Sequence, residues 1–188
     1  MAASNASQRL FFALWPDPGL QRELARRAAE ALGHRRARPT PAANLHVTLA
    51  FLGEVDAAAR ACAEAAAGRV TAAPFTVSLD RLGYWGRRGL LWAGPSQPPP
   101  AMAGLAADLG EALAADCGFE RERRPFQAHI TLARKVPKMP GRLAMAPLEW
   151  PVARFVLVAS ELGPGGATYT IVGEWPLTDD PPTDATET

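Results

Sequence analysis

Two short segments of the chain place a histidine two residues before a threonine. His46 and Thr48 lie in the segment LHVTLA, and His129 and Thr131 lie in AHITLA. A single segment of this kind is a weak signal, because threonine favours strands and a lone histidine is usually structural. The chain contains three histidines, and two of them share nearly the same context. The repetition therefore favours a joint chemical role over a structural one.

Each segment is predicted to be a strand with one polar face. Side chains alternate across a strand, so His46 and Thr48 point to one side and the leucines and Val47 to the other. The same alternation applies to His129 and Thr131. Each strand then offers an apolar face to a core and an imidazole with a hydroxyl to a cleft. If the strands belong to two lobes related by a pseudo-two-fold axis, the polar pairs converge on the cleft from opposite sides.

Two imidazoles on either side of a phosphorus atom suit in-line displacement. One ring takes a proton from water while the other gives a proton to the departing oxygen, and no metal ion is required. The hydroxyls of Thr48 and Thr131, about 7 Å along the strand from each imidazole, are placed to donate to the non-bridging phosphoryl oxygens. These residues predict a complete metal-free site for chemistry at phosphorus.

Arginines near the two segments are candidates for binding phosphate. Arg134, five positions after His129, is predicted to share the face of His129 and Thr131 if the strand stays regular; a solvated arginine at the strand end is the equal alternative. Basic loops precede both segments, and we expect them as a set to line the rim of the cleft and hold a phosphate backbone, although such charge runs are usually solvated. The candidates on the rim are Arg36, Arg38, Arg123 and Arg124.

Aromatic residues give a less specific prediction. Phe51 does not share the face of His46 in a regular strand, so it is assigned to the core. Tyr84, Trp85 and Phe126 are candidates for stacking on a nucleobase, with core or sheet packing as the default for each. The sequence does not choose among the three.

Composition indicates a globular protein without a general affinity for polyanions. The 188 residues are 48% apolar and carry a formal net charge of +1, whereas a generic nucleic-acid binder carries far more positive charge. Cys62 and Cys117 lie in Ala-rich helical stretches and are interpreted as small buried apolar residues of a protein in a reducing cytoplasm, not as a disulfide. No run approaches the roughly 18 apolar residues of a membrane span, and the first residues lack the pattern of a signal peptide.

The order of elements predicts the α+β class. Strands come in pairs separated by helices, and the hairpins favour antiparallel sheets. A proline-rich stretch at 95–100 is interpreted as a boundary between lobes. The predicted elements are strands at 9–16, 45–53, 126–134 and 150–162, helices at 18–32, 56–67 and 102–117, a hairpin over 74–94 that turns at 86–89, a loop at 136–147 and a terminal hairpin ending at 177.

The chain resembles the bacterial and archaeal RNA 2′,3′-cyclic phosphodiesterases, also called 2′-5′ RNA ligases, of the two-histidine (2H) phosphoesterase superfamily. The defining tandem motifs are His46-Val47-Thr48 and His129-Ile130-Thr131. The resemblance covers residues 8–177 and extends to the segments RLFFALWP, NLHVTLAFLG, DRLGYW, LLWAGP, RPFQAHITLARK, LEWPV and VLVASELGPGGATYTIVGEWPL.

This resemblance implies a single bilobal domain over 8–177, with two pseudo-symmetric lobes around a V-shaped cleft, flanked by disordered residues 1–7 and an acidic disordered tail at 178–188. It implies an enzyme that hydrolyses a terminal RNA 2′,3′-cyclic phosphate to a 2′-phosphomonoester without metal or cofactor. His46 is then the proton donor and His129 the acceptor. Reversal of the same chemistry implies ATP-independent 2′-5′ joining of RNA ends, such as tRNA halves. We expect a cytoplasmic monomer.

Two other functions use the same residues. A binding module that recognises RNA ends without turnover needs the cleft, although it has no use for a proton donor and acceptor on either side of the phosphate. A metallohydrolase with His46 and His129 as ligands needs a third protein ligand, and the sequence offers none at a recognisable spacing. Turnover in the presence of EDTA separates these alternatives from the two-histidine enzyme.

Overall fold

The computed structural model describes residues 7–138, 144–164 and 166–178. Two antiparallel sheets carry the architecture, so the predicted α+β class is confirmed. In chain order the elements are β1 (Gln8–Leu14), α1 (Pro18–Leu32), β2 (Arg38–Pro39), η1 (Ala42–Asn44), β3 (Val47–Val55), α2 (Ala57–Ala67), β4 (Phe75–Trp85), η2 (Gly86–Arg88), β5 (Leu90–Gly94), α3 (Pro100–Cys117), β6 (Ile130–Arg134), β7 (Ala144–Val152), β8 (Arg154–Gly163) and β9 (Gly166–Pro176).

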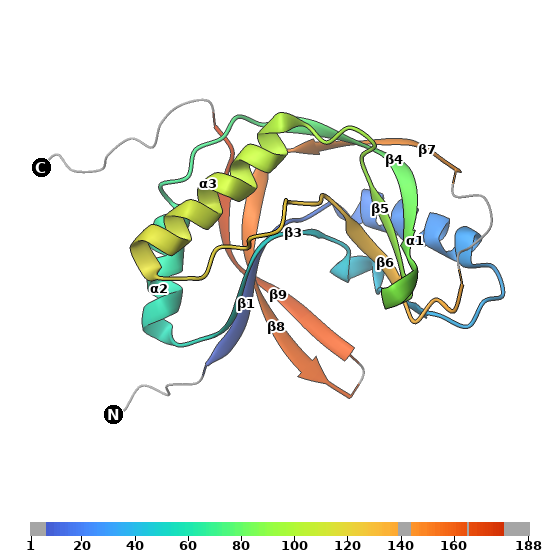
Figure 1. The fold of residues 1–188 in the computed structure, drawn as a ribbon, viewed down its shortest axis with the longest axis horizontal. Helices are drawn as coiled ribbons and strands as arrows, with labels where there is room; N and C mark the ends of the chain where they lie inside the picture. The colour runs from blue at the N-terminus through green and yellow to red at the C-terminus, as the bar shows by residue number, and fades with distance from the viewer. Residues whose placement is uncertain (1–6, 139–143, 165, 179–188) are drawn as a thin grey trace, which may run out of the picture.

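Each sheet has its own helices (Figure 1). The four-stranded sheet has the order β3-β1-β8-β9, and α2 and α3 lie side by side against it. The five-stranded sheet has the order β2-β6-β5-β4-β7, with α1 beside β2 and β6. The two histidine motifs lie one in each sheet, at β3 and β6. This arrangement is the two-lobed geometry that the repeated motif predicts.

The central strand β1 is apolar on both faces because both faces are covered. Leu10, Phe12 and Leu14 are fully buried in the main core. Phe11 and Ala13 point the other way and form a small second cluster with buried valines of β8. The nearly continuous apolar run in RLFFAL is typical of a strand packed on both sides.

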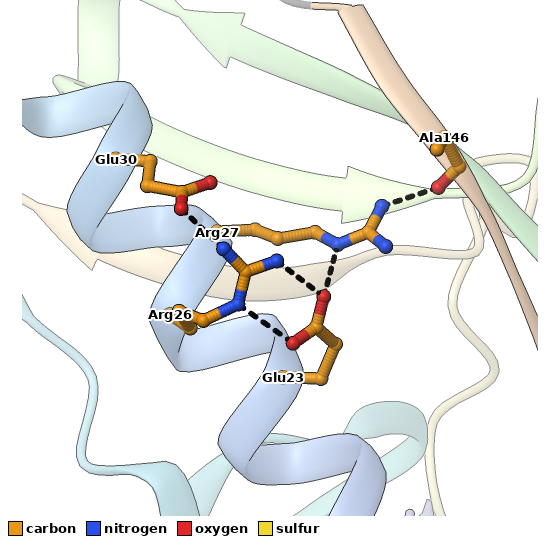
Figure 2. Close-up of polar contacts among 5 residues, drawn as sticks. All are labelled: Glu23, Arg26, Arg27, Glu30 and Ala146. Atoms are coloured by element: carbon orange, nitrogen blue, oxygen red, sulfur yellow. Dashed lines mark hydrogen bonds and ion pairs between the residues drawn. The ribbon is translucent and has the colours of Figure 1, made fainter.

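Helix α1 follows its predicted bounds. The Asp17 side chain accepts hydrogen bonds from the first turn, 2.7 Å from the Gly19 nitrogen, and Gly33 ends the helix at a φ of 54°. Figure 2 shows how an ion-pair network on this helix reaches the five-stranded sheet: Glu23 pairs with Arg26 and Arg27, and Arg27 donates to the carbonyl of Ala146 on β7. The two guanidinium groups lower the pKa of Glu23 to about 2.

The predicted strand at 150–162 is wrong as a single element. It consists of the end of β7, which pairs with β4, and most of β8, which pairs with β1 and β9 in the other sheet. The chain changes sheets at Ala153, and the apolar pattern continues across this point without a break. Pro151 is accommodated because β7 is an edge strand. Within the predicted loop at 136–147, β7 begins at Ala144, and 139–143 lie outside the described residues.

The proline-rich stretch at 95–100 does not divide the chain into two lobes. There the chain does pass from β5 of one sheet to α3 on the other, but it also changes sheets between β2 and β3, between α2 and β4, and between β7 and β8. Buried residues of both sheets form one contiguous core. The predicted disordered ends, apart from Ser7 and Thr178, lie outside the described residues.

The interpretation of the two cysteines is wrong. Cys62 on α2 and Cys117 at the end of α3 form a disulfide, with their Cα atoms 5.8 Å apart. Both helical stretches were predicted, but helix periodicity does not show that the two helices lie side by side. The disulfide removes the argument from the cysteines for a reducing compartment. No helix among the described residues is long and apolar enough to cross a membrane.

Candidate active site

The structure brings the two predicted motifs to one pocket. His46, Thr48, His129 and Thr131 all line a cavity of about 530 Å³. Each histidine lies immediately before its strand, since β3 begins at Val47 and β6 begins after His129. The predicted strands therefore start slightly early, at 45 and 126, but the convergence of the two polar pairs is as expected.

Both imidazoles are held in the same tautomer. The Nδ1 of His46 lies 2.7 Å from the carbonyl oxygen of Asn44, and the Nδ1 of His129 lies 2.8 Å from that of Gln127. A carbonyl oxygen accepts hydrogen bonds, so Nδ1 of each ring carries the proton and donates. The Nε2 nitrogens are left for chemistry. In the first motif Nε2 lies 3.2 Å from the Thr48 hydroxyl.

Three aromatic rings surround His46. Trp15 stacks on the imidazole with 5.2 Å between ring centroids and 6° between ring planes, while Phe11 and Tyr169 contact it at 4.9 and 5.4 Å. Removal from water disfavours the charged imidazolium. Burial thus lowers the pKa of His46 to about 4, with smaller contributions from repulsion by His129 when that ring is protonated and from the positive charge of Arg134.

His129 has a different environment. Trp85 meets its ring edge-on at a centroid distance of 4.7 Å, and the guanidinium of Arg88 lies over the Trp85 ring, 6.0 Å from its centroid. Burial lowers the pKa of His129, and the positive charges of Arg134 and Arg88 lower it further. A pocket with two neutral imidazoles and nearby arginines suits an anionic ligand.

Both motif strands contain a β-bulge at the same place. Thr48 and Ala50 pair with consecutive residues of β1, leaving Leu49 unpaired, and Thr131 and Ala133 pair with consecutive residues of β5, leaving the leucine between them unpaired. A bulge reverses the alternation of the residues that follow it. The position five residues after each histidine consequently turns toward the pocket.

These bulges correct two predictions. Phe51, assigned to the core, lines the pocket and is 57% exposed. Arg134 lines the pocket together with His129 and Thr131, as predicted, but the stated reason is wrong. Five positions along a regular strand lead to the opposite face, and Arg134 reaches this face because of the bulge at Leu132.

The other candidates are only partly brought to the pocket. Arg38 lines it, whereas Arg36, Arg123 and Arg124 are not among the described residues that do, and Arg124 pairs with Glu122 instead. Of the aromatic candidates, Tyr84 and Phe126 pack against the core and Trp85 contacts the second histidine. The exposed ring in the pocket belongs to Phe51.

The polypeptide before His46 is fixed by helix α1 and by strand β9. Gln21, a buried polar residue of α1, donates to the carbonyls of Ala43 and Leu45 at 3.4 and 3.3 Å. The Asn44 side chain donates to the carbonyl of Ala167 on β9 at 2.9 Å. These bonds hold the Asn44 carbonyl where it orients the imidazole of His46.

Sequence reasoning missed the aromatic neighbours of His46 and the roles of Gln21 and Asn44. Trp15 and Phe11 lie in the apolar run RLFFALWP, where nothing distinguishes a pocket residue from a core residue. A glutamine at a core-facing position of an amphipathic helix is the one signal that was available for Gln21. Among the described residues, no group of three His, Cys, Asp or Glu side chains is placed to hold a metal ion.

Comparison with known proteins agrees with this geometry. Residues 16–164 match the model of the 2′-5′ RNA ligase superfamily. The chain belongs to this family. It is 37% identical over 178 residues to the RNA 2′,3′-cyclic phosphodiesterase of Escherichia coli, covering 91% of this chain and 97% of that protein. The enzyme of the same name from Thermus thermophilus is 32% identical over 183 residues, covering 90% of each chain.

A solved structure extends the likeness to the fold. The crystal structure of Escherichia coli LigT in complex with 3′-AMP superposes with a TM-score of 0.80 at 35% identity, covering 92% of this chain and 99% of that one. The two-lobed fold of the superfamily, predicted from the motifs, is thereby confirmed.

Proposed function

We propose that this protein hydrolyses the terminal 2′,3′-cyclic phosphate of an RNA to a 2′-phosphomonoester, using two histidines and no metal ion. The observation that carries the proposal is the shared pocket, in which both imidazoles have Nδ1 fixed by a backbone carbonyl. The relatives named RNA 2′,3′-cyclic phosphodiesterase, similar over nearly the whole chain, support the choice of substrate.

The chemistry follows from the two Nε2 nitrogens. A cyclic phosphate held between them is attacked in line by water, which loses a proton to one imidazole while the other protonates the departing 3′ oxygen. Negative charge grows on the non-bridging oxygens, and Thr48, Thr131 and Arg134 stabilise it by donating hydrogen bonds. The oxygen of the water forms a new bond to phosphorus as the bond to the 3′ oxygen breaks, and the product keeps its phosphate on the 2′ oxygen.

We assign His46 as the donor and His129 as the acceptor. The surroundings of His46 oppose this assignment in the empty site, because its pKa is lowered to about 4. The negative charge of a bound phosphodiester opposes that effect, since an anion close to an imidazole favours its protonated form. The donor is therefore charged only when substrate is bound. The reverse reaction, 2′-5′ joining of RNA ends such as tRNA halves, exchanges the two roles.

The remaining lining suits a nucleotide. Phe51 presents an exposed ring for stacking on a base, and Arg38 adds positive charge on the opposite sheet. The relative LigT was crystallised with 3′-AMP, which is a single nucleotide. We propose a monomer, because one chain supplies both histidines. A cytoplasmic location is likewise only proposed, and the cysteines give it no support, because they form a disulfide.

The test is hydrolysis of a nucleoside 2′,3′-cyclic phosphate in EDTA. The wild type is compared with His46→Ala, His129→Ala and His34→Ala, and phosphorus NMR identifies the product. His34 is exposed just after α1 and is not among the residues that line the pocket, so its variant is the control. We expect a 2′-phosphate from the wild type and the control, and losses of at least about 100-fold for the two pocket variants. Binding without turnover would favour a non-catalytic RNA-end receptor, and inhibition by EDTA would favour a metallohydrolase.

A further inference from the structure

The lining of the pocket includes exposed apolar side chains. Among the described residues, the large hydrophobic side chains that remain exposed are Phe51 at 57% and Leu162 at 74%, and both line the pocket. They come from β3 and β8, the two strands that flank β1 in the four-stranded sheet. Exposed apolar surface in a pocket is typical of a ligand contact.

Arg9 lies on β1 between these two strands. It pairs with Glu54 of β3 on one side and with Ser160 of β8 on the other. Its guanidinium lies over the Phe51 ring, 4.9 Å from the centroid, and the residue lines the same pocket. None of the salt bridges found among the described residues involves Arg9. Its charge faces the pocket beside an aromatic ring.

The distance from the reaction centre indicates which part of a substrate meets Arg9. Thr48 pairs with Ala13 on β1, and Arg9 is four residues further along that strand, or about 13 Å. The cyclic phosphate itself is met by the threonines and by Arg134 at the other end. Arg9 is therefore too far from Thr48 to share the cyclic phosphate, and its guanidinium is placed to meet a part of the strand beyond the reacting phosphate.

We propose that Arg9, with Phe51 and Leu162 beside it, forms a second subsite that binds the phosphodiester joining the terminal nucleotide to the rest of the RNA strand. This inference rests on the proposed function of the site. Arginine beside an aromatic ring is a common way to hold single-stranded nucleic acid, because the ring meets a base and the guanidinium a phosphate. Every RNA end carries this phosphodiester and a free nucleoside cyclic phosphate lacks it, so the subsite selects RNA ends over mononucleotides.

The test compares two substrates with the same terminal nucleotide: the nucleoside 2′,3′-cyclic phosphate and a trinucleotide that ends in it. For Arg9→Gln we expect kcat/KM on the trinucleotide to fall about five- to tenfold more than on the mononucleotide, the size of one charge-assisted hydrogen bond in a partly exposed site. The slope of log kcat/KM against log salt on the trinucleotide should also become shallower by about 0.7, the value for one phosphate contact of a single strand.

Arg154→Gln is the matched control, because Arg154 is an exposed arginine of the same sheet that pairs with Glu174 on β9. Arg154→Gln should leave kcat/KM unchanged on both substrates. Equal losses of the Arg9 variant on both substrates, or no loss on the trinucleotide, would overturn the subsite. Failure of the proposed function appears separately, as absence of turnover by the wild type. The affinities of wild type and Arg9→Gln for the 2′-phosphorylated trinucleotide and mononucleotide then give the same comparison without turnover.

Discussion

The enclosed imidazole of His46 couples the stability of the fold to pH. Its pKa is lowered from 6.5 to about 4, so between these values the unfolded chain binds a proton that the folded chain does not. Stability must then fall as the pH falls from 6.5 toward 4, and the loss is complete below pH 4. The cause is the packing of Trp15, Phe11 and Tyr169 around the ring.

The expected size follows from the two pKa values. A shift from 6.5 to about 4 corresponds to about 3 kcal/mol when fully developed. Integrated between pH 7 and pH 5, the same pair of values gives a loss of about 2 kcal/mol in the free energy of unfolding. Partial exposure of the ring makes this figure an upper value.

Replacement of His46 by asparagine isolates this contribution. The asparagine amide can still donate to the Asn44 carbonyl but does not titrate, while His129 and the carboxylates remain in both proteins. Urea unfolding at pH 7 and pH 5, with the disulfide intact, should show the wild type losing about 2 kcal/mol more than His46→Asn. Parallel losses in the two proteins would show that His46 is not held neutral by its surroundings, and the reasoning would be refuted.

Three further results are expected. Because the pKa values of both His46 and His129 are lowered, the descending limb of the pH profile of kcat/KM, measured with a nucleoside 2′,3′-cyclic phosphate, should be centred below 6.5; a centre at 7.5 would contradict the described electrostatics. Replacing Cys62 and Cys117 by serine opens a link between residues 55 positions apart and should lower the free energy of unfolding by up to about 4 kcal/mol; titration of free thiols in the denatured wild type should find none. Gln21→Leu removes the donor to the carbonyls around Asn44 and should lower kcat more than it raises KM, and the idea fails if only KM changes.

The sequence predicted the residues of the site better than their surroundings. Alternation along a strand was enough to put His46 with Thr48 and His129 with Thr131, because the two bulges come after these pairs. It failed for Phe51, which lies beyond the first bulge. A bulge inserts one residue without any change in hydrophobic pattern that a single sequence reveals.

Contacts between distant segments account for the other errors. The disulfide needs α2 and α3 side by side, and the change of sheet at Ala153 needs two partner strands in different sheets. The local propensity of a segment predicts neither the contact between the two helices nor the change of sheet. Helix α1 was predicted at its true bounds because Asp17 and Gly33 are local signals that act within one turn.

The two copies of the motif form two halves of one site, and the residues around the two halves differ. The position five residues after the first histidine is Phe51, and the equivalent position after the second is Arg134; both reach the pocket by the same kind of bulge. Three rings surround His46 and a fourth, Phe51, follows the first motif, whereas Arg134 and Arg88 lie near the second motif, where Trp85 is the aromatic neighbour of the histidine. A nucleotide has the same division between base and phosphate, so identical His-x-Thr segments acquire different tasks from the residues around them. We therefore propose that this asymmetry sets the sense in which a substrate lies across the pocket, with its phosphate toward Arg134 and its base toward Phe51.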